Sequence, residues 1–396
     1  MTFSPAPARF GPLTGFTIGL LLLMNIYAPQ ALLPLLAREF GLSTAQVGAA
    51  IGSTTLAIAL ASPVAGLLAD ALGRRRVMLW AFALLLLPCL GAAFAGNFTA
   101  LNVARFAQGL LIPLVSVALT AYLAEETPPG TLGRYVSAYI SGTVLGGFLG
   151  RFVSGLVAHG DNWHAAFWFL MVTNALGLAL VWRLPPSRRF QPALDRHAAA
   201  RTLRSHLKNT RLLTLCVVGF LILFVLVAVF NTIPFRLSAP PYHLGSGALG
   251  GIFAVYLLGV VVTPASAPFV ARLGTPRALV AAAGLSLLGL ALTLFSPLWV
   301  VIAGLALASS GVFIAQAAAQ SAIQFSVSEG RSLAGGLYNA TYYAGAAVAS
   351  VAAGAAYDAG GWRAVAALCA LALLGVAGPS AVVGRRLRQQ EAVQVG

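Results

Sequence analysis

Acidic residues are scarce in this chain of 396 residues, which holds nine Asp and Glu against 24 Lys and Arg. Charged residues make up only 8% of the sequence, whereas soluble domains carry about 25%. Hydrophobic residues make up 59%. A chain with so little charge cannot cover a globular surface with solvated side chains. The composition therefore excludes a soluble domain and indicates a membrane protein that crosses the bilayer many times.

Cysteine is also rare, with three residues at Cys89, Cys216 and Cys369, all inside apolar runs. Their spacing fits neither a metal site nor a disulfide framework. The chain has no HExxH, GxSxG or P-loop sequence and no cluster of histidine or carboxylate inside an apolar run. We therefore expect no metal, no cofactor and no enzymatic activity.

Apolar runs of membrane-crossing length recur along the whole chain. The sequence predicts twelve membrane-spanning helices, at 14–36, 43–68, 77–95, 99–124, 134–158, 163–183, 211–234, 246–271, 276–296, 299–324, 333–357 and 362–383.

The net charge of +15 is unevenly distributed between the predicted loops. If both termini are cytoplasmic, the cytoplasmic segments hold 19 of the 24 basic residues and the outer loops hold three. Basic residues concentrate in cytoplasmic loops, so this bias predicts the orientation. The charge points to membrane lipids as partners and not to nucleic acid.

One long polar segment divides the predicted spans into six and six. It contains eight basic residues between Arg183 and Arg211. The sequence thus predicts an N-terminal six-helix bundle over 1–183, a basic cytoplasmic linker over 184–210, and a C-terminal six-helix bundle with a short basic tail over 211–396.

The two halves are related in sequence. A shift of 201 residues places Gly73 on Gly274, and a shift of 199 places Gly146 on Gly345 and Tyr139 on Tyr338. Parallel halves of this kind are typical of transporters, in which substrate binds between the halves near the middle of the membrane.

Four segments carry a more specific resemblance. They are the loop 66–76 with Asp70, Gly73 and Arg74–Arg76; Arg105-Phe-Ala-Gln108-Gly109; the run 141–151; and Tyr27-Ala-Pro-Gln30-Ala-Leu-Leu-Pro34. Together with twelve spans divided six and six, these segments resemble the major facilitator superfamily, and the resemblance covers nearly the whole chain.

Within that superfamily the chain is similar to the drug:proton antiporter-1 branch, near the arabinose and polyol exporters. The resemblance implies an all-α fold of two pseudo-symmetric six-helix bundles around a central cavity. It also implies monomeric, proton-coupled export of a small molecule across a bacterial inner membrane by alternating access. Two positions depart from the pattern: Ala71 replaces a basic residue, and Gly146-Gly147 replaces Gly-Pro.

The resemblance and the charges together give the predicted gating and coupling residues. Asp70 and Arg74 would close the cytoplasmic face, and the family's helix 4 arginine is tied to proton coupling. Arg151 would bind an anionic group, or instead extend to the outer headgroups. Close helix packing explains the glycines of helix 5, and a seam between the halves is the alternative. The predicted residues are Asp70, Gly73, Arg74, Arg105, Gly146, Gly150 and Arg151.

Polar residues in the helices that line the cavity of this fold give the predicted substrate site. Hydrogen bonds between helices are the alternative explanation for about half of them. The candidates are Asn25, Tyr27, Gln30, Gln108, Asn231, Gln316, Gln320, Tyr338, Asn339 and Tyr342.

The lack of acid inside the membrane leaves a second function open. All nine acidic residues map to loops or helix ends, whereas Arg105 and Arg151 lie inside predicted spans. A buried arginine without a buried acid favours uptake or facilitated transport of an organic anion or another metabolite.

Overall fold

The computed structural model describes residues 10–127, 130–158, 162–187, 196–324, 326–327 and 331–395. Within these ranges all regular elements are helical. In chain order they are α1 (Pro12–Tyr27), η1 (Ala28–Leu32), α2 (Leu33–Phe40), α3 (Thr44–Leu72), α4 (Arg74–Ala93), α5 (Phe98–Glu126), α6 (Leu132–Val157), α7 (His164–Arg183), α8 (Arg196–His206), α9 (Thr210–Ser238), α10 (Ser246–Ile252), η3 (Phe253–Leu257), α11 (Leu258–Leu273), α12 (Thr275–Leu292), α13 (Leu298–Gln324) and α14 (Arg331–Val395).

Eleven helices in the described part of the chain are long and apolar enough to cross a membrane, where the sequence predicts twelve. The difference lies in α14, which contains a single candidate span, Leu333–Gly378, of 46 residues. An unbroken helix of that length would measure about 69 Å, twice the thickness of a bilayer core. Gly360 and Gly361 leave helical geometry, with φ of −149° and +61°. This break separates the two spans predicted at 333–357 and 362–383.

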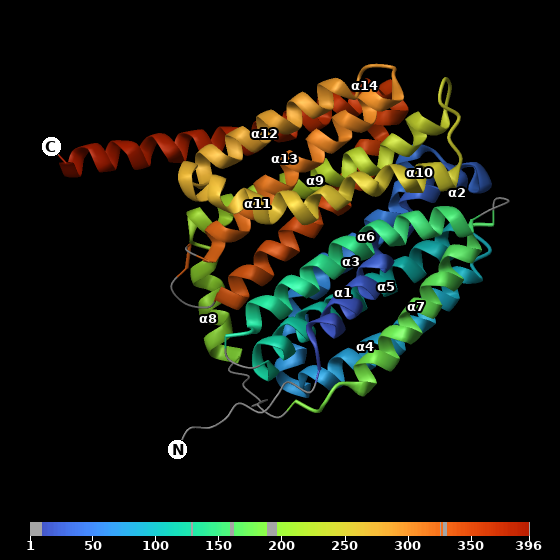
Figure 1. Cartoon of the computed structure of the whole chain (residues 1–396), viewed down its shortest axis with the longest axis horizontal. Helices are drawn as coiled ribbons and strands as arrows, with labels where there is room; N and C mark the ends of the chain where they lie inside the picture. The colour runs from blue at the N-terminus through green and yellow to red at the C-terminus, as the bar shows by residue number, and fades with distance from the viewer. Residues whose placement is uncertain are drawn as a thin grey trace. The chain divides into compact units, whose positions relative to one another are not determined.

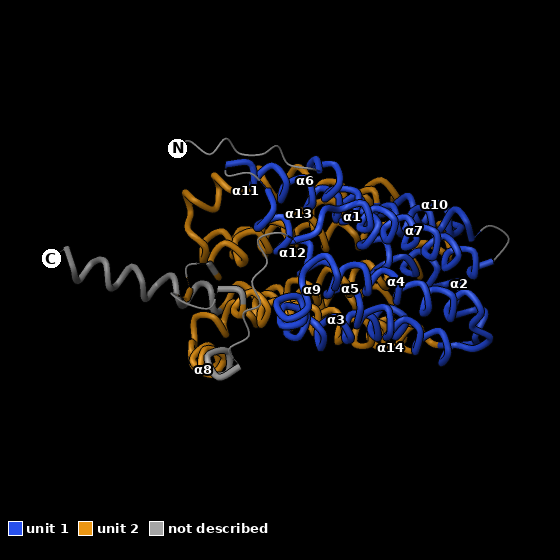
Figure 2. Tube along the Cα trace, turned by 90° about the horizontal axis from the view of Figure 1, so that it is seen from below, with its two compact units in different colours: residues 1–42, 49–196, 244–253 blue, residues 43–48, 197–243, 254–396 orange. Residues whose placement is uncertain are grey.

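The chain divides into two compact units, coloured separately in Figure 2. Unit 1 holds residues 1–42, 49–196 and 244–253; unit 2 holds 43–48, 197–243 and 254–396. The first residues of α3 thus belong to unit 2, and α10 belongs to unit 1. The predicted linker is not wholly irregular, because it contains α8; residues 188–195 of it lie outside the described residues.

A single glycine joins two membrane helices in each unit. Gly73 separates α3 from α4 and has φ of +92°, and Gly274 separates α11 from α12 with φ of +72°. Residues with a Cβ avoid this part of backbone space, so glycine allows the chain to reverse within one residue. The two turns are the pair that the sequence repeat aligns.

Close helix packing repeats in the same way. In Figure 1, α1 runs beside α6 in unit 1, and α9 and α14 also pack together. A Cβ on Gly146 of α6 would lie 2.1 Å from the carbonyl oxygen of Leu20, and one on Gly345 of α14 would lie 2.1 Å from that of Phe220. Glycine at these positions lets the two backbones touch. The equivalent halves therefore have equivalent helix contacts.

Candidate functional site

The first predicted span is not one continuous helix. It consists of α1, the 3-10 turn η1 and α2, and Pro29 and Pro34 lie at the start of η1 and of α2. Proline has no N–H and so cannot donate to the carbonyl four residues earlier. The carbonyl of Asn25 therefore loses its helical partner at Pro29. Backbone groups freed inside a membrane must be satisfied by protein or line a cavity.

Arg105 of α5 binds the chain immediately before this break. Its Nη1 donates to the Asn25 carbonyl at 2.7 Å and its Nη2 to the Ile26 carbonyl at 2.5 Å. Its Nε donates to the Ala50 carbonyl of α3 at 3.1 Å. The side chain is fully buried. One guanidinium group therefore joins α1, α3 and α5, and it satisfies the carbonyl that Pro29 leaves without a helical donor.

A polar network extends from Arg105 across unit 1. Arg105 donates to Gln108 at 2.6 Å, and Gln108 donates to the Cys89 sulfur at 3.1 Å. Asn25 and Asn174 exchange amide hydrogen bonds of 3.0 and 2.8 Å, and Asn174 also donates to Cys89. Asn25, Gln108 and Asn174 are fully buried. The network holds α1, α4, α5 and α7 together, so it explains two of the predicted substrate residues by interhelical bonding.

Cys89 and Asn174 are members of this network that were not among the predicted site residues. The sequence does show a polar group in each run, since Cys89 lies in the apolar run of α4 and Asn174 follows Thr173 in that of α7. Only the fold shows that the two runs meet at Asn25.

Arg151 of α6 lies on the other side of the break. Its Nε donates to the side-chain oxygen of Gln30 in η1 at 2.5 Å, and its Nη1 donates to the Gly147 carbonyl at 2.6 Å. The guanidinium lies over the rings of Tyr27, at 4.5 Å, and Phe253, at 5.1 Å. The side chain is fully buried. Arg151 therefore lies among neutral polar groups and aromatic rings, in contact with two predicted substrate residues.

Asp70 and Arg74 form an ion pair of 2.6 Å across the α3–α4 turn. The two residues predicted to close the cytoplasmic face are thus in direct contact within unit 1, and their gating role stays a prediction. Arg74 also binds Glu125, near the end of α5, through two hydrogen bonds of 2.9 and 3.2 Å. The arginine is 8% exposed. Glu125 was missed because only the fold brings the end of α5 to this turn.

We expect the two carboxylates to act together on Arg74. Asp70→Asn or Glu125→Gln alone should lower the free energy of unfolding by about 1 kcal/mol, because one charged partner remains. The double variant should lose clearly more than the sum, because it removes both carboxylates of this cluster. Thermal unfolding of the purified protein in detergent measures all four species. Simple additivity would contradict a shared ion cluster.

The glycines of α6 contact α1 of the same unit. A Cβ on Gly142 would lie 2.0 Å from the Phe16 carbonyl oxygen, and a Cβ on Gly150 would lie 2.6 Å from the Met24 carbonyl oxygen. These contacts are close packing inside unit 1. Another glycine of α6, Gly155, meets α10, where its Cβ would lie 2.4 Å from the Ser246 carbonyl oxygen.

The candidate residues of unit 2 differ in burial. Asn231 of α9 is 2% exposed and donates to the Ser350 hydroxyl of α14 at 3.1 Å. Tyr338 is buried and stacks on Tyr342, with ring centroids 5.7 Å apart. Gln316 is half-buried, and Gln320 and Asn339 are exposed. The structure therefore brings the two tyrosines together and ties Asn231 to α14.

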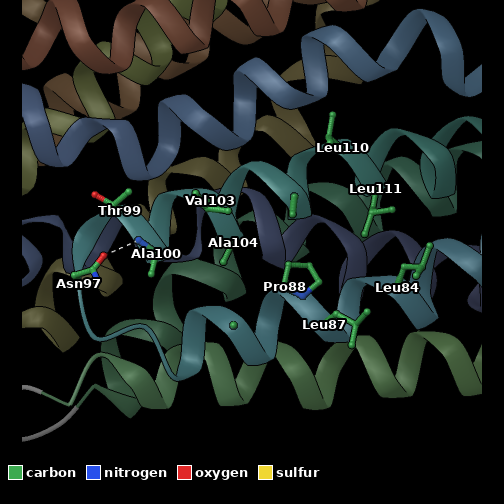
Figure 3. Close-up of a pocket in the computed structure, with 12 residues that line it drawn as sticks. Leu84, Leu87, Pro88, Asn97, Thr99, Ala100, Val103, Ala104, Leu110 and Leu111 are labelled. Atoms are coloured by element: carbon green, nitrogen blue, oxygen red, sulfur yellow. Dashed lines mark hydrogen bonds between the residues drawn. The ribbon is translucent and has the colours of Figure 1, made fainter.

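A groove of about 830 Å³ lies between α4 and α5 in unit 1 (Figure 3). Leu87 and Val103 line it and are 64% and 65% exposed. Its polar residues, Asn97 and Thr99, lie at one end. None of the described residues that line it belongs to the predicted substrate site. Such an apolar lining is typical of a surface that faces lipid tails.

Comparison with known proteins agrees with this architecture. The model of the Major Facilitator Superfamily matches residues 15–330 and 237–392. The chain is 32% identical over 352 residues to the uncharacterized MFS-type transporter YybF of Bacillus subtilis, covering 88% of this chain and 87% of that protein. It is 31% identical over 377 residues to the inner membrane transport protein YnfM of Escherichia coli, covering 95% and 89%.

Solved structures support the fold. The crystal structure of a mutant of the nucleoside transporter NupG superposes with a TM-score of 0.78 at 14% identity, covering 94% of this chain and 99% of that one. At this identity the likeness shows the fold alone. Since the family model and the two relatives span most of the sequence, the chain belongs to the major facilitator superfamily, a family of membrane transporters and not of enzymes.

Proposed function

We propose that this protein exports a small molecule across the bacterial inner membrane by alternating access, driven by protons. Its position in a family of membrane transporters supports transport in general. The resemblance of residues 27–34 to the drug:proton antiporter-1 branch and of the run 141–151 to the antiporter signature supports export. The resemblance of residues 105–109 to the family's second signature supports proton coupling. The basic loops support cytoplasmic termini.

The observation that carries the proposal is the broken first span. α1 ends at Tyr27 and α2 begins at Leu33, and a buried arginine binds the chain on each side of the break. Interrupted helices near the middle of the membrane are where transporters bind substrate, because their free backbone groups and helix ends can face a cavity. The residues here are amide, phenol and arginine within apolar walls, which suit a moderately polar or amphipathic molecule.

Uptake of an organic anion is the second candidate function. Arg105 and Arg151 place two buried positive charges in unit 1, and the sequence predicts all nine acidic residues in loops or at helix ends. A buried cation attracts a negatively charged ligand more strongly than the same cation in water. A carboxylate or phosphate substrate would fit this charge.

Flux in proteoliposomes distinguishes the two functions. Purified protein is reconstituted and offered sugars, organic anions and cationic dyes, with and without an imposed pH gradient. Export driven by protons predicts transport that rises several-fold with the gradient and is abolished by a proton ionophore. Flux of an organic anion at a rate that does not depend on the pH gradient would favour the second function instead.

The ion cluster is tested in the same vesicles. We expect Asp70→Asn to transport at less than about a third of the wild-type rate, because the closing of one face then rests on Arg74 and Glu125 alone. Glu39→Gln, which removes an exposed acid elsewhere, is the matched control and should transport normally. Wild-type rates for Asp70→Asn would refute a gating role for this carboxylate.

A further inference from the structure

A carboxylate from α14 caps the first turn of α3. Asp358 accepts the backbone N–H of Thr44 at its Oδ1 and that of Ala45 at its Oδ2, both at 3.0 Å. Thr44 is 314 positions from Asp358 along the chain. Both partners belong to unit 2, which includes residues 43–48.

This cap is added to a local one. Ser43 and Gln46 form a capping box at the start of α3, in which the Gln46 N–H donates to the Ser43 hydroxyl at 3.3 Å and the Ser43 N–H donates to the Gln46 side-chain oxygen at 3.0 Å. The first N–H groups of a helix have no partner inside the helix, and a side chain next to the helix start normally accepts from one of them. Here one carboxylate accepts from two, and its negative charge faces the positive end of the helix dipole. The start of α3 is therefore held both by its own first residues and by a distant part of the chain.

Two close backbone contacts lie directly beside this cap. A Cβ on Gly354 would lie 2.5 Å from Cα of Ala45, and a Cβ on Gly48 would lie 2.0 Å from the Ser350 carbonyl oxygen. Ser350, Gly354 and Asp358 are spaced four apart on α14, so they form one stripe of that helix. We call these contacts, from Gly48–Ser350 to Thr44–Asp358, the α3–α14 seam.

The close glycine contact of the seam has a counterpart in unit 1. The repeat offsets of 201 and 199 place Ala45 on Ser246 and Gly354 on Gly155, and a Cβ on Gly155 would lie 2.4 Å from the Ser246 carbonyl oxygen. The close glycine contact is therefore present in both units. Asp358 aligns with His159, which lies outside the residues whose side chains are described. In the sequence, the position aligned with Asp358 therefore holds no carboxylate.

The position of Asp358 suits a contact that must open. Asp358 is exposed, so water can replace its two backbone partners without leaving a buried charge. The opposite end of α3 carries Asp70, in the cluster with Arg74 and Glu125. Asp70 lies 26 residues after Thr44 in α3, about 39 Å along the helix axis. Each end of α3 is therefore bound by an acidic side chain, on opposite faces of the membrane.

We propose that Asp358 is a positioning residue of the transport cycle: by capping α3 it holds the α3–α14 seam closed on the face opposite Arg74–Arg76. The cap forms when that face is shut and is released when it opens. This inference rests on the alternating access proposed above, and it requires neither a known substrate nor proton coupling.

Labelling of a cysteine at the seam tests the proposal without substrate. Thr44 is 9% exposed, so Thr44→Cys should react slowly with a membrane-impermeant maleimide applied to intact cells. The parent chain, whose three cysteines are buried, gives the background. Adding Asp358→Asn should raise the labelling rate about tenfold, the scale expected from loss of a helix cap. Asp358→Glu keeps the charge and should stay within about threefold of the parent.

Two further variants complete the test. Glu39→Gln is the matched control and should label like the parent, because it removes an exposed acid that caps no helix in the described structure. Gly354→Ala forces the α3–α14 seam apart while Asp358 is intact, so it should also raise the labelling rate. If Asp358→Asn does not fold, Gly354→Ala tests the proposal in its place. Labelling that stays within twofold of the parent in folded Asp358→Asn, or in Gly354→Ala, would overturn the proposal. Faster labelling without proton-driven flux would refute the proposed driving force and leave the cap standing.

Discussion

Arg105→Lys should reduce transport about a hundredfold or more while leaving the charge in place. Arg105 donates to three backbone carbonyls and to Gln108 in four directions, at 2.5 to 3.1 Å. A guanidinium offers five N–H groups in a planar fork, whereas an ammonium donates from a single point on a flexible chain. Lysine therefore cannot reach α1 and α3 at once. Carbonyls left unsatisfied beside the Pro29 break would cost about 1–3 kcal/mol each.

The loss should appear in both activity and stability. A hundredfold drop in rate corresponds to about 2.7 kcal/mol, within the cost of breaking a buried charged network. Flux in proteoliposomes and thermal unfolding in detergent measure the two effects. Arg134→Lys, at an exposed position of α6, is the matched control and should change neither. If Arg105→Lys transports at the wild-type rate, the hydrogen bonds from Arg105 to α1 and α3 are not needed for transport.

Gly146→Ala should destabilise the protein by about 3 kcal/mol, because one methyl group has no space there. The added Cβ would lie 2.1 Å from the Leu20 carbonyl oxygen and 2.8 Å from its Cα. Both are backbone atoms and cannot rotate away, so α1 and α6 must separate. Overpacking of this kind costs about 1–3 kcal/mol, and separation of the helices also loses contacts along their length.

A second glycine of the same helix gives the control. A Cβ on Gly133 would meet nothing within 4 Å, so Gly133→Ala should be neutral or stabilise α6 by up to about 1 kcal/mol. The two substitutions are chemically identical and differ only in the neighbouring helix. Thermal unfolding and the yield of monodisperse protein compare them directly. Equal stability of the two variants would show that the α1–α6 contact tolerates a methyl group.

The fold was predicted from the sequence because its signals are local. Apolar length gives the spans, and composition gives the membrane. Gly73 and Gly274 were aligned by the repeat, and both prove to be one-residue turns with positive φ. The last two predicted spans lie close together, and the structure joins them in the single element α14. No polar loop separates them; Gly360–Gly361 breaks the helix between them.

The candidate site was predicted in part. Arg105 and Gln108 were selected from a motif, and Tyr27 and Gln30 from a proline-containing span that proved to be broken. Their partners could not be found in this way. Asn174 bonds to Asn25, 149 residues away, and Cys89 to Gln108, 19 residues away. Glu125 bonds to Arg74, 51 residues away. No local pattern in the sequence encodes such pairs.

The sequence alone therefore determined what the chain must be in a membrane: helical, many times spanning, internally repeated, and poor in acid. These properties follow from hydropathy, chain length and charge, which can be read from the sequence without knowing which residues are in contact. Tertiary structure decided which side chains meet, because helix packing brings distant residues within hydrogen-bond reach. It placed Arg105 on the carbonyl that Pro29 leaves free, and it brought Asp358 to the start of α3.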